Sequence, residues 1–191
     1  MRIGIDVDGT LTDLQRFEFD RGTVYFKKDV VRTDSMQIRN TFGVSKEEEG
    51  KFWDDNVFDY AENFPPYQHA ADVINQLHEE GHEIIIITAR YHTYLDTETG
   101  KKMRDTVKGW LRKNNIYFDK VVFTHENKKQ RCRELSVDIM LEDKASNALE
   151  IARDRKVILM DQPWNRKTEA ANIYRIHSWY QVIDKIEEIT E

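Results

Sequence analysis

Asp6 and Asp8 stand two positions apart near the start of the sequence, and an apolar run from Ile3 to Val7 contains or borders both of them. Such a run predicts a buried strand. Open α/β sheets bind their ligands beyond the carboxyl ends of the strands, so the two carboxylates are expected at a binding edge. Strand alternation places Asp6 and Asp8 on one side, where they repel each other unless a cation or a shared proton intervenes.

The residues that follow suit a phosphate and a hard metal ion. Gly9 permits a tight turn whose amides can donate to phosphate oxygens, and Thr10 can fix that loop. Carboxylate oxygens are the ligands that Mg²⁺ prefers. The competing interpretation is an ordinary Asp8-Gly9 turn with Asp6 as a solvated strand end. For this dipeptide alone the ordinary turn would be the better interpretation.

Three further polar groups follow other predicted elements and argue against an ordinary turn. They are Thr88-Ala89-Arg90, the pair Lys128-Lys129 and the pair Glu142-Asp143. The first and third end apolar runs, and the second opens a helical pattern. All are therefore expected at the same edge of the sheet as Asp6.

The elements that must position these residues alternate between strands and helices. Apolar runs predict strands at Ile3 to Val7, Glu83 to Thr88, Lys120 to Phe123, Asp138 to Leu141, Lys156 to Met160 and Ile173 to Ile176. Between them, apolar residues at spacings of three and four predict helices near residues 70–77, 103–111, 145–152 and 179–186. Strands that alternate with single helices indicate an α/β fold with a Rossmann-like, doubly wound parallel sheet.

Residues 13–66 do not follow this alternation. The segment is too long for a simple loop, carries many aromatic residues and ends at Pro65-Pro66, which predicts a hinge or a helix start. We expect a small helical cap inserted after the first strand, on a core made of residues 1–12 and 67–191. Most of its rings should pack within the cap, with one or two in the pocket.

These motifs resemble those of the haloacid dehalogenase-like superfamily, in which four motifs match Asp6 to Thr10, Thr88, a lysine at 128 or 129, and Glu142-Asp143. The resemblance implies a phosphatase, because the dehalogenating branch lacks an acid at the position of Asp8. It implies that Asp6 attacks phosphorus, while Asp8 protonates the leaving alcohol and then deprotonates water.

The same resemblance implies the remaining site residues. Magnesium would be held by Asp6, by the main-chain carbonyl of Asp8 and by Asp143. The substrate phosphate would be bound by Gly9, Thr10, Thr88, Ala89, Arg90 and Lys128. Lys128 is preferred over Lys129 as the catalytic lysine. Glu142 is either a supporting acid or strand-end charge, and Arg90 either touches phosphate or caps a helix.

A closer resemblance is to the nucleotidase branch that includes the 5′(3′)-deoxyribonucleotidases and related bacterial proteins. It rests on the segments 3–10, 139–143 and 161–165, and on the size of the cap. The implied substrate is a nucleoside monophosphate. Two alternatives stay open: a sugar or polyol phosphatase of the same fold, and an inactive protein that binds a phosphate ligand.

Composition narrows the partners and the compartment. A net charge of −6 gives no general basic field for a nucleic-acid polymer, so the expected partner is a small phosphate monoester. Cys132 is the only cysteine, and the amino terminus has no apolar signal run. We expect a cytoplasmic protein that does not contact a membrane, and the choice between a monomer and a homodimer stays open.

The segment His78-Glu79-Glu80-Gly81-His82 formally matches a zinc-protease motif, in which two histidines share one helix face. Gly81 should end the helix, so the two imidazoles would not share a face. We therefore reject a zinc site.

Overall fold

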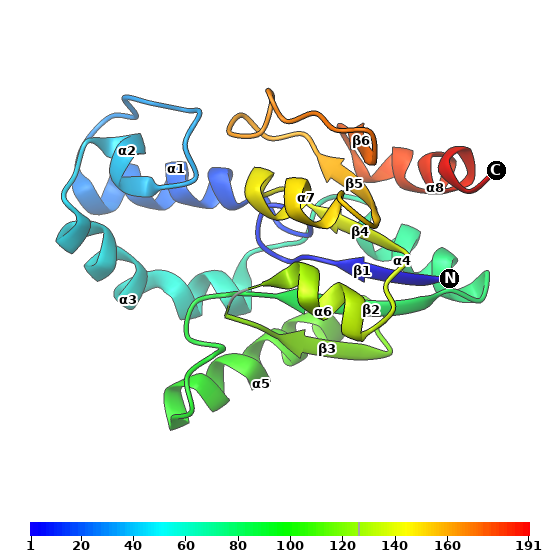
Figure 1. The fold of residues 1–191 in the computed structure, drawn as a ribbon. Coiled ribbons are helices and arrows are strands. Elements are labelled where there is room, and N and C mark those ends of the chain that lie inside the picture. The colour runs from blue at the N-terminus through cyan, green and yellow to red at the C-terminus, as the bar shows by residue number, and fades with distance from the viewer. Residues whose placement is uncertain (126) are drawn as a thin grey trace.

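The protein is described by a computed structural model that covers residues 1–125 and 127–191. Six parallel strands form one sheet in the order β3-β2-β1-β4-β5-β6 (Figure 1). The strands are β1 (Arg2–Ile5), β2 (Glu83–Thr88), β3 (Lys120–Phe123), β4 (Ile139–Glu142), β5 (Lys156–Met160) and β6 (Ile173–Ile176). The predicted α/β, doubly wound architecture is confirmed.

Helices cover both faces of the sheet (Figure 1). One face carries α4 (Ala70–Glu79), α5 (Glu98–Lys113) and α8 (Val182–Thr190). The 3₁₀ turn η1 (Trp179–Gln181) directly precedes α8. The other face carries α6 (Lys128–Glu134) and α7 (Ala145–Ile151). Alternate residues of each strand serve the two faces: Ile84 and Ile86 pack in the first cluster, and Ile85 and Ile87 in the second. Burial on both faces explains why the strands have continuous apolar runs.

Strand β1 lies at the centre of the sheet, where Ile3 pairs with Ile84 of β2 and with Ile139 of β4. It ends at Ile5, two residues earlier than the sequence predicts. The amide of Asp6 still donates to the carbonyl of Leu141. The carbonyl of Val7, however, already accepts hydrogen bonds from backbone amides of the turn that follows. The two aspartates are therefore outside the regular strand.

The inserted cap holds three helices, α1 (Leu14–Phe26), α2 (Ile38–Phe42) and α3 (Lys46–Asn63), beyond the carboxyl ends of the strands (Figure 1). Helix α3 begins with a capping box, in which Ser45 and Glu48 bond each other's backbone amides. Rings of Phe17, Phe42 and Phe52 form a separate apolar cluster inside the cap. Most of the aromatic residues of this segment pack there, as the sequence predicts.

The chain enters and leaves the cap at one place. Thr12 and Pro66 form a β-bridge, and the amide of Tyr67 donates to the carbonyl of Leu11 at 2.7 Å. Pro65 and Pro66 thus lie in the connection back to the core, and the predicted helix start is wrong, because α4 begins only at Ala70. None of the helices in the described ranges has the length and apolar character needed to cross a membrane.

Candidate active site

Three carboxylates and one ammonium group meet at the carboxyl edge of the sheet. Asp6 follows β1, Glu142 ends β4 and Asp143 follows it, and one oxygen of each lies within 4.8 Å of the others. Lys128, the first residue of α6, places its Nζ 2.5 Å from Asp6 Oδ1 and 2.8 Å from Glu142 Oε2. All four side chains are buried. Lys129, the alternative lysine, is only half-buried and does not enter this cluster.

Glu142 supports Lys128 and the chain beside it. Its Oε2 accepts from Lys128, and its Oε1 accepts from the amides of Asp143 at 3.3 Å and Lys144 at 3.0 Å. The side chain is completely buried, so it is not a solvated charge at the end of a strand. Its two oxygens are thus engaged by Lys128 and by the backbone amides beside it.

The electrostatics of this cluster suit a divalent cation. Burial raises the pKa of Asp6 to about 7 against the opposing effect of Lys128. Burial, with the charges of Glu142 and Asp6, raises the pKa of Asp143 well above its usual range. Three carboxylates beside one ammonium group leave an excess of two negative charges when all are ionised, in a site with only oxygen ligands. Such a site fits a hard divalent ion.

Position 9 requires a glycine for two reasons, its backbone conformation and the closeness of Asp143. Its φ is +83°, and a Cβ built there would lie 2.3 Å from Oδ2 of Asp143. The amides of Gly9 and Thr10 bond within the turn, to the carbonyls of Thr12 at 3.0 Å and Val7 at 3.4 Å. Thr10 Oγ1 donates to Asp143 Oδ1 at 3.4 Å. The turn thus brings the first and fourth motifs into contact, and its binding of phosphate stays a prediction.

Asp8 has a different partner from Asp6. Its carboxylate forms an ion pair with Arg90, whose Nε lies 3.0 Å from Oδ1 and 3.3 Å from Oδ2. Strand alternation does not decide their placement, because β1 ends before either residue, and the expectation that both lie on one side stays a prediction; the charge of Asp8 is among the causes that raise the pKa of Asp6. Arg90 neither caps a helix nor lies in the acidic cluster.

Two other predicted residues lie at the end of β2. Thr88 is buried, and its Oγ1 accepts from the amide of Arg90 at 3.2 Å. Ala89 is exposed between them. Both stay predicted phosphate-binding residues.

The loop after β5 supports the site through side chains to which the sequence assigned no role. Trp164 Nε1 donates to Asp143 Oδ2 at 3.2 Å, and Asn165 Nδ2 donates to the carbonyl of Asp143 at 2.7 Å. Gln162 Nε2 donates to the carbonyl of Gly9 at 2.8 Å. The signal in the sequence was the position of this polar segment after a strand, which puts it at the binding edge.

Cap and core together enclose a cavity of about 200 Å³ beside Asp8. The cap contributes Leu14, Trp53, Val57 and Tyr60, and the core contributes Asp8, Arg90 and Tyr91. The cavity is therefore lined mainly by apolar and aromatic side chains, with one ion pair at its wall. Cavities of this kind, mainly apolar with a few polar groups, are typical of small-molecule sites.

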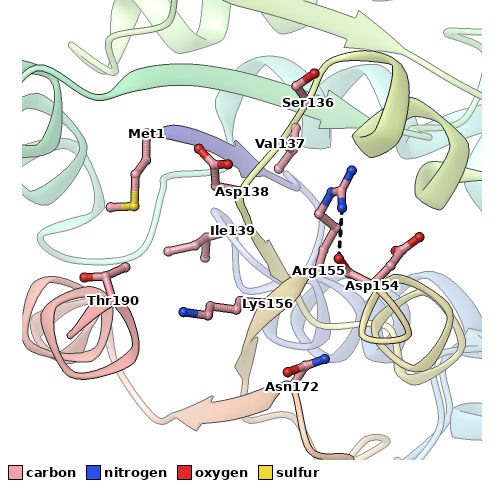
Figure 2. Close-up of a pocket in the computed structure, with 10 residues that line it drawn as sticks. All are labelled: Met1, Ser136, Val137, Asp138, Ile139, Asp154, Arg155, Lys156, Asn172 and Thr190. Carbon is pink, nitrogen blue, oxygen red and sulfur yellow. Dashed lines mark hydrogen bonds between the residues drawn. The ribbon is translucent and has the colours of Figure 1, made fainter.

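A second cavity, of about 700 Å³, lies at the opposite edge of the sheet, where β4 and β5 begin (Figure 2). Several of its polar groups bond to the chain: Arg155 to the carbonyl of Asp154, Asp138 to the amide of Arg2, and Asn172 to a carbonyl. None of the motif residues lines it, so the carboxyl edge is the candidate active site.

The two histidines of the zinc-protease motif lie on either side of the end of α4. His78 lies in α4 and stacks on Tyr117 with ring centroids 3.4 Å apart. Gly81 follows the helix with a φ of +87°, and His82 comes after it. The helix thus ends before Gly81, as the sequence predicts.

Comparison with known families and proteins gives a consistent result. Residues 1–190 match the family model described as 5′ nucleotidase, deoxy (pyrimidine), cytosolic type C protein. A nucleotidase of Clostridium acetobutylicum is 29% identical over 199 residues, which cover 100% of this chain and 97% of the relative. The protein YqfW of Bacillus subtilis is 28% identical over 195 residues, with 96% and 92% covered.

Solved structures share the fold at low sequence identity. A hydrolase of the haloacid dehalogenase superfamily from Ehrlichia chaffeensis is 13% identical with a TM-score of 0.58, and the alignment covers 100% of this chain and 97% of that one. The D,D-heptose 1,7-bisphosphate phosphatase of B. bronchiseptica is 12% identical with a TM-score of 0.55, and 98% of each chain is covered.

Proposed function

Because this chain belongs to the cytosolic type C family of 5′ nucleotidases, within the haloacid dehalogenase-like phosphoric monoester hydrolases, we propose that it hydrolyses nucleoside monophosphates with Mg²⁺ through a phosphorylated Asp6. The observation that carries this proposal is the buried cluster of Asp6, Lys128, Glu142 and Asp143 at the carboxyl edge of the sheet. It brings the proposed nucleophile, a cation and further carboxylate oxygens together in one place.

Asp6 is the nucleophile in this proposal. One of its carboxylate oxygens forms a bond to phosphorus while the bond from phosphorus to the leaving alcohol breaks, and the proton of the Asp8 carboxyl group passes to the alkoxide. Water then attacks the aspartyl phosphate and gives a proton to Asp8. The bond from Asp6 to phosphorus breaks, and phosphate is released.

Lys128 has two functions in these steps. It holds Asp6 by the 2.5 Å ion pair and places positive charge beside the phosphate oxygens. Burial alone would lower the pKa of Lys128, but Asp6 and Glu142 raise it above its ordinary value, so the group stays charged. The transition state of phosphoryl transfer needs mainly positioning and charge neutralisation, which this lysine supplies.

Asp6, Asp143 and the main-chain carbonyl of Asp8 are the proposed ligands of Mg²⁺. When bound, Mg²⁺ supplies positive charge that polarises the phosphate. The excess negative charge of the cluster supports this choice, and the heptose bisphosphate phosphatase that shares the fold was solved with magnesium and phosphate. Thr10 and Trp164 donate to the carboxylate of Asp143 and hold it toward the cluster.

The cavity between cap and core supports a nucleoside as the leaving group. Trp53, Tyr60 and Tyr91 supply aromatic faces at its wall, next to the Asp8 side chain that would protonate the leaving alcohol. Stacking of one base on an aromatic side chain contributes about 1–3 kcal/mol. A nucleotide should therefore react with a kcat/KM about tenfold or more above that of ribose 5-phosphate.

The test is a comparison of kcat/KM for deoxynucleoside and nucleoside monophosphates with that for sugar and polyol phosphates. Tyr91→Leu removes an aromatic wall of the cavity, and Tyr94→Leu is its control, because Tyr94 has similar exposure but does not line the cavity. We expect only Tyr91→Leu to reduce the preference for nucleotides. Equal or better cleavage of sugar phosphates by the wild type would reject the nucleotide assignment and leave the phosphatase assignment in place.

A further inference from the structure

Arg90 is a buried cation that the chemistry at Asp6 does not use. Its side chain is 2% exposed, and it comes two residues after β2. Its guanidinium carbon lies 4.8 Å from the ring centroid of Tyr60, a residue of the cap helix α3. An arginine buried in this way must be held by specific partners, because burial of an unpaired charge is costly.

The contacts of Arg90 fix the orientation of one carboxylate. Nε and Nη2 both contact Oδ1 of Asp8, whereas Nε is the one guanidinium donor that contacts Oδ2, at 3.3 Å. A planar guanidinium with several fixed donors restricts a carboxylate more than a single flexible ammonium group does. Of the two oxygens, the guanidinium thus leaves Oδ2 the freer for proton transfer.

The cap completes this arrangement. The ring of Tyr60 covers the guanidinium, and its hydroxyl lies 2.6 Å from Oγ1 of Thr12, which itself donates to the carbonyl of Val7. Arg90 is therefore held between Asp8 and a ring that is anchored to the catalytic loop. Both it and Asp8 line the cavity in which the leaving group would lie.

One donor of Arg90 has no partner in the described part of the chain. Nη1 is buried and makes no hydrogen bond, although a buried unpaired donor usually costs about 1–3 kcal/mol. The ion pair with Asp8 is thus the contact that offsets the burial of this guanidinium.

We propose that Arg90 is a positioning residue that orients Asp8 for proton transfer to the leaving alcohol. This inference rests on the proposed function. It assigns Arg90 to the leaving group and Asp8, in place of the phosphate binding that the sequence predicts. The competing explanation is that Arg90 has a purely structural role in holding cap and core together. The positioning role predicts a loss of activity that depends on the leaving group, whereas the structural role predicts the same loss for every substrate.

The experiment measures kcat/KM for p-nitrophenyl phosphate and for a nucleoside monophosphate, in the wild type, Asp8→Asn, Arg90→Met and the double variant. The nitrophenolate leaves without a proton, whereas the alkoxide of a nucleoside needs one. We expect Arg90→Met to lower kcat/KM for the nucleotide at least about tenfold more than for p-nitrophenyl phosphate. In the Asp8→Asn background it should cause little further loss, because the two residues act as a unit.

Two variants provide controls. Arg90→Lys keeps the charge and should restore part of the nucleotide activity; it also tests the selective loss if Arg90→Met does not fold. Arg39→Met breaks an ion pair with Glu49 inside the cap and should affect both substrates by the same factor.

Equal losses for both substrates, or losses that add to those of Asp8→Asn, would overturn the positioning role while the phosphatase stands. A wild type that cleaves neither substrate would reject the proposed function, and this inference with it.

Discussion

Replacing Gly9 with alanine should damage the metal site more than the fold. The backbone at Gly9 has a φ of +83°, and the added Cβ would lie 2.3 Å from Oδ2 and 2.6 Å from Cγ of Asp143. These atoms belong to a proposed ligand of Mg²⁺, held in place by Thr10 and Trp164. The carboxylate must move for the methyl group to fit, so the variant changes the position of the ligand itself.

Gly9→Ala has two effects, a cost in backbone conformation and the displacement of Asp143, and a substitution at a second glycine separates them. The left-handed backbone costs about 1–2 kcal/mol for an alanine. Gly81 has a φ of +87° with no atom within 4 Å of a built Cβ, so Gly81→Ala carries this backbone cost alone. Gly9→Ala carries a similar cost and in addition displaces Asp143, which should raise the Mg²⁺ concentration for half-maximal activity by about tenfold or more.

The assay combines thermal unfolding with Mg²⁺ titration of phosphatase activity for both variants. A loss of 1 kcal/mol lowers the Tm of a chain of this size by about 2–4 °C, so both variants should unfold a few degrees early. Only Gly9→Ala should need more Mg²⁺. A Gly9→Ala protein with the wild-type Mg²⁺ requirement would refute the reasoning that the glycine makes room for a metal ligand.

Three further perturbations test separate parts of the structure. Lys128→Met leaves its two buried carboxylate partners without their cation, so it should destabilise the protein in EDTA by about 3–5 kcal/mol, and an unchanged Tm would contradict the ion-pair network. Glu18 is buried in the cap, and burial raises the pKa of its carboxyl group well above 4.5. The folded state therefore binds the carboxyl proton more tightly than the unfolded state does. Stability is lost as the pH rises above 4.5 and through the pKa of the folded state. Glu18→Gln should thus increase the Tm more at pH 8 than at pH 5, and an equal increase at both would contradict this. Trp164→Phe removes the hydrogen-bond donor to Asp143 and should weaken Mg²⁺ binding about tenfold. Trp110→Phe is the control and should leave Mg²⁺ binding unchanged, because the indole of Trp110 donates to a carbonyl outside the site. Equal Mg²⁺ affinities of the two variants would contradict the role of Trp164.

The sheet was predictable because its signals are local. Runs of β-branched residues predicted all six strands, and four of the six have the predicted bounds. The two strands with other bounds, β1 and β4, are the ones that carry Asp6, Glu142 and Asp143 at their carboxyl ends. A strand boundary in such a place depends on hydrogen bonds such as that from Asp6 to Leu141, which no local pattern contains.

The site was predictable in its types of residue and less so in its contacts. Placing motif residues at one edge required only the topology of a parallel sheet, and the buried Lys128 beside Asp6 agrees with that expectation. The ion pair of Arg90 with Asp8 joins residues 82 positions apart, through a side chain that could extend in several directions. Residue spacing does not determine such pairs, because they depend on the packing of the cap over the core.

The central claim is that Asp6 carries the phosphoryl group in a reaction that needs Mg²⁺. The most direct measurement is the rate of phosphate release from a deoxynucleoside monophosphate by the wild type and by Asp6→Asn, each with Mg²⁺ and with excess EDTA. We predict turnover only for the wild type with Mg²⁺, and a loss of about 10³-fold or more in Asp6→Asn. Near-wild-type turnover by Asp6→Asn, or undiminished release in EDTA, in preparations free of contaminating phosphatase, would contradict the claim.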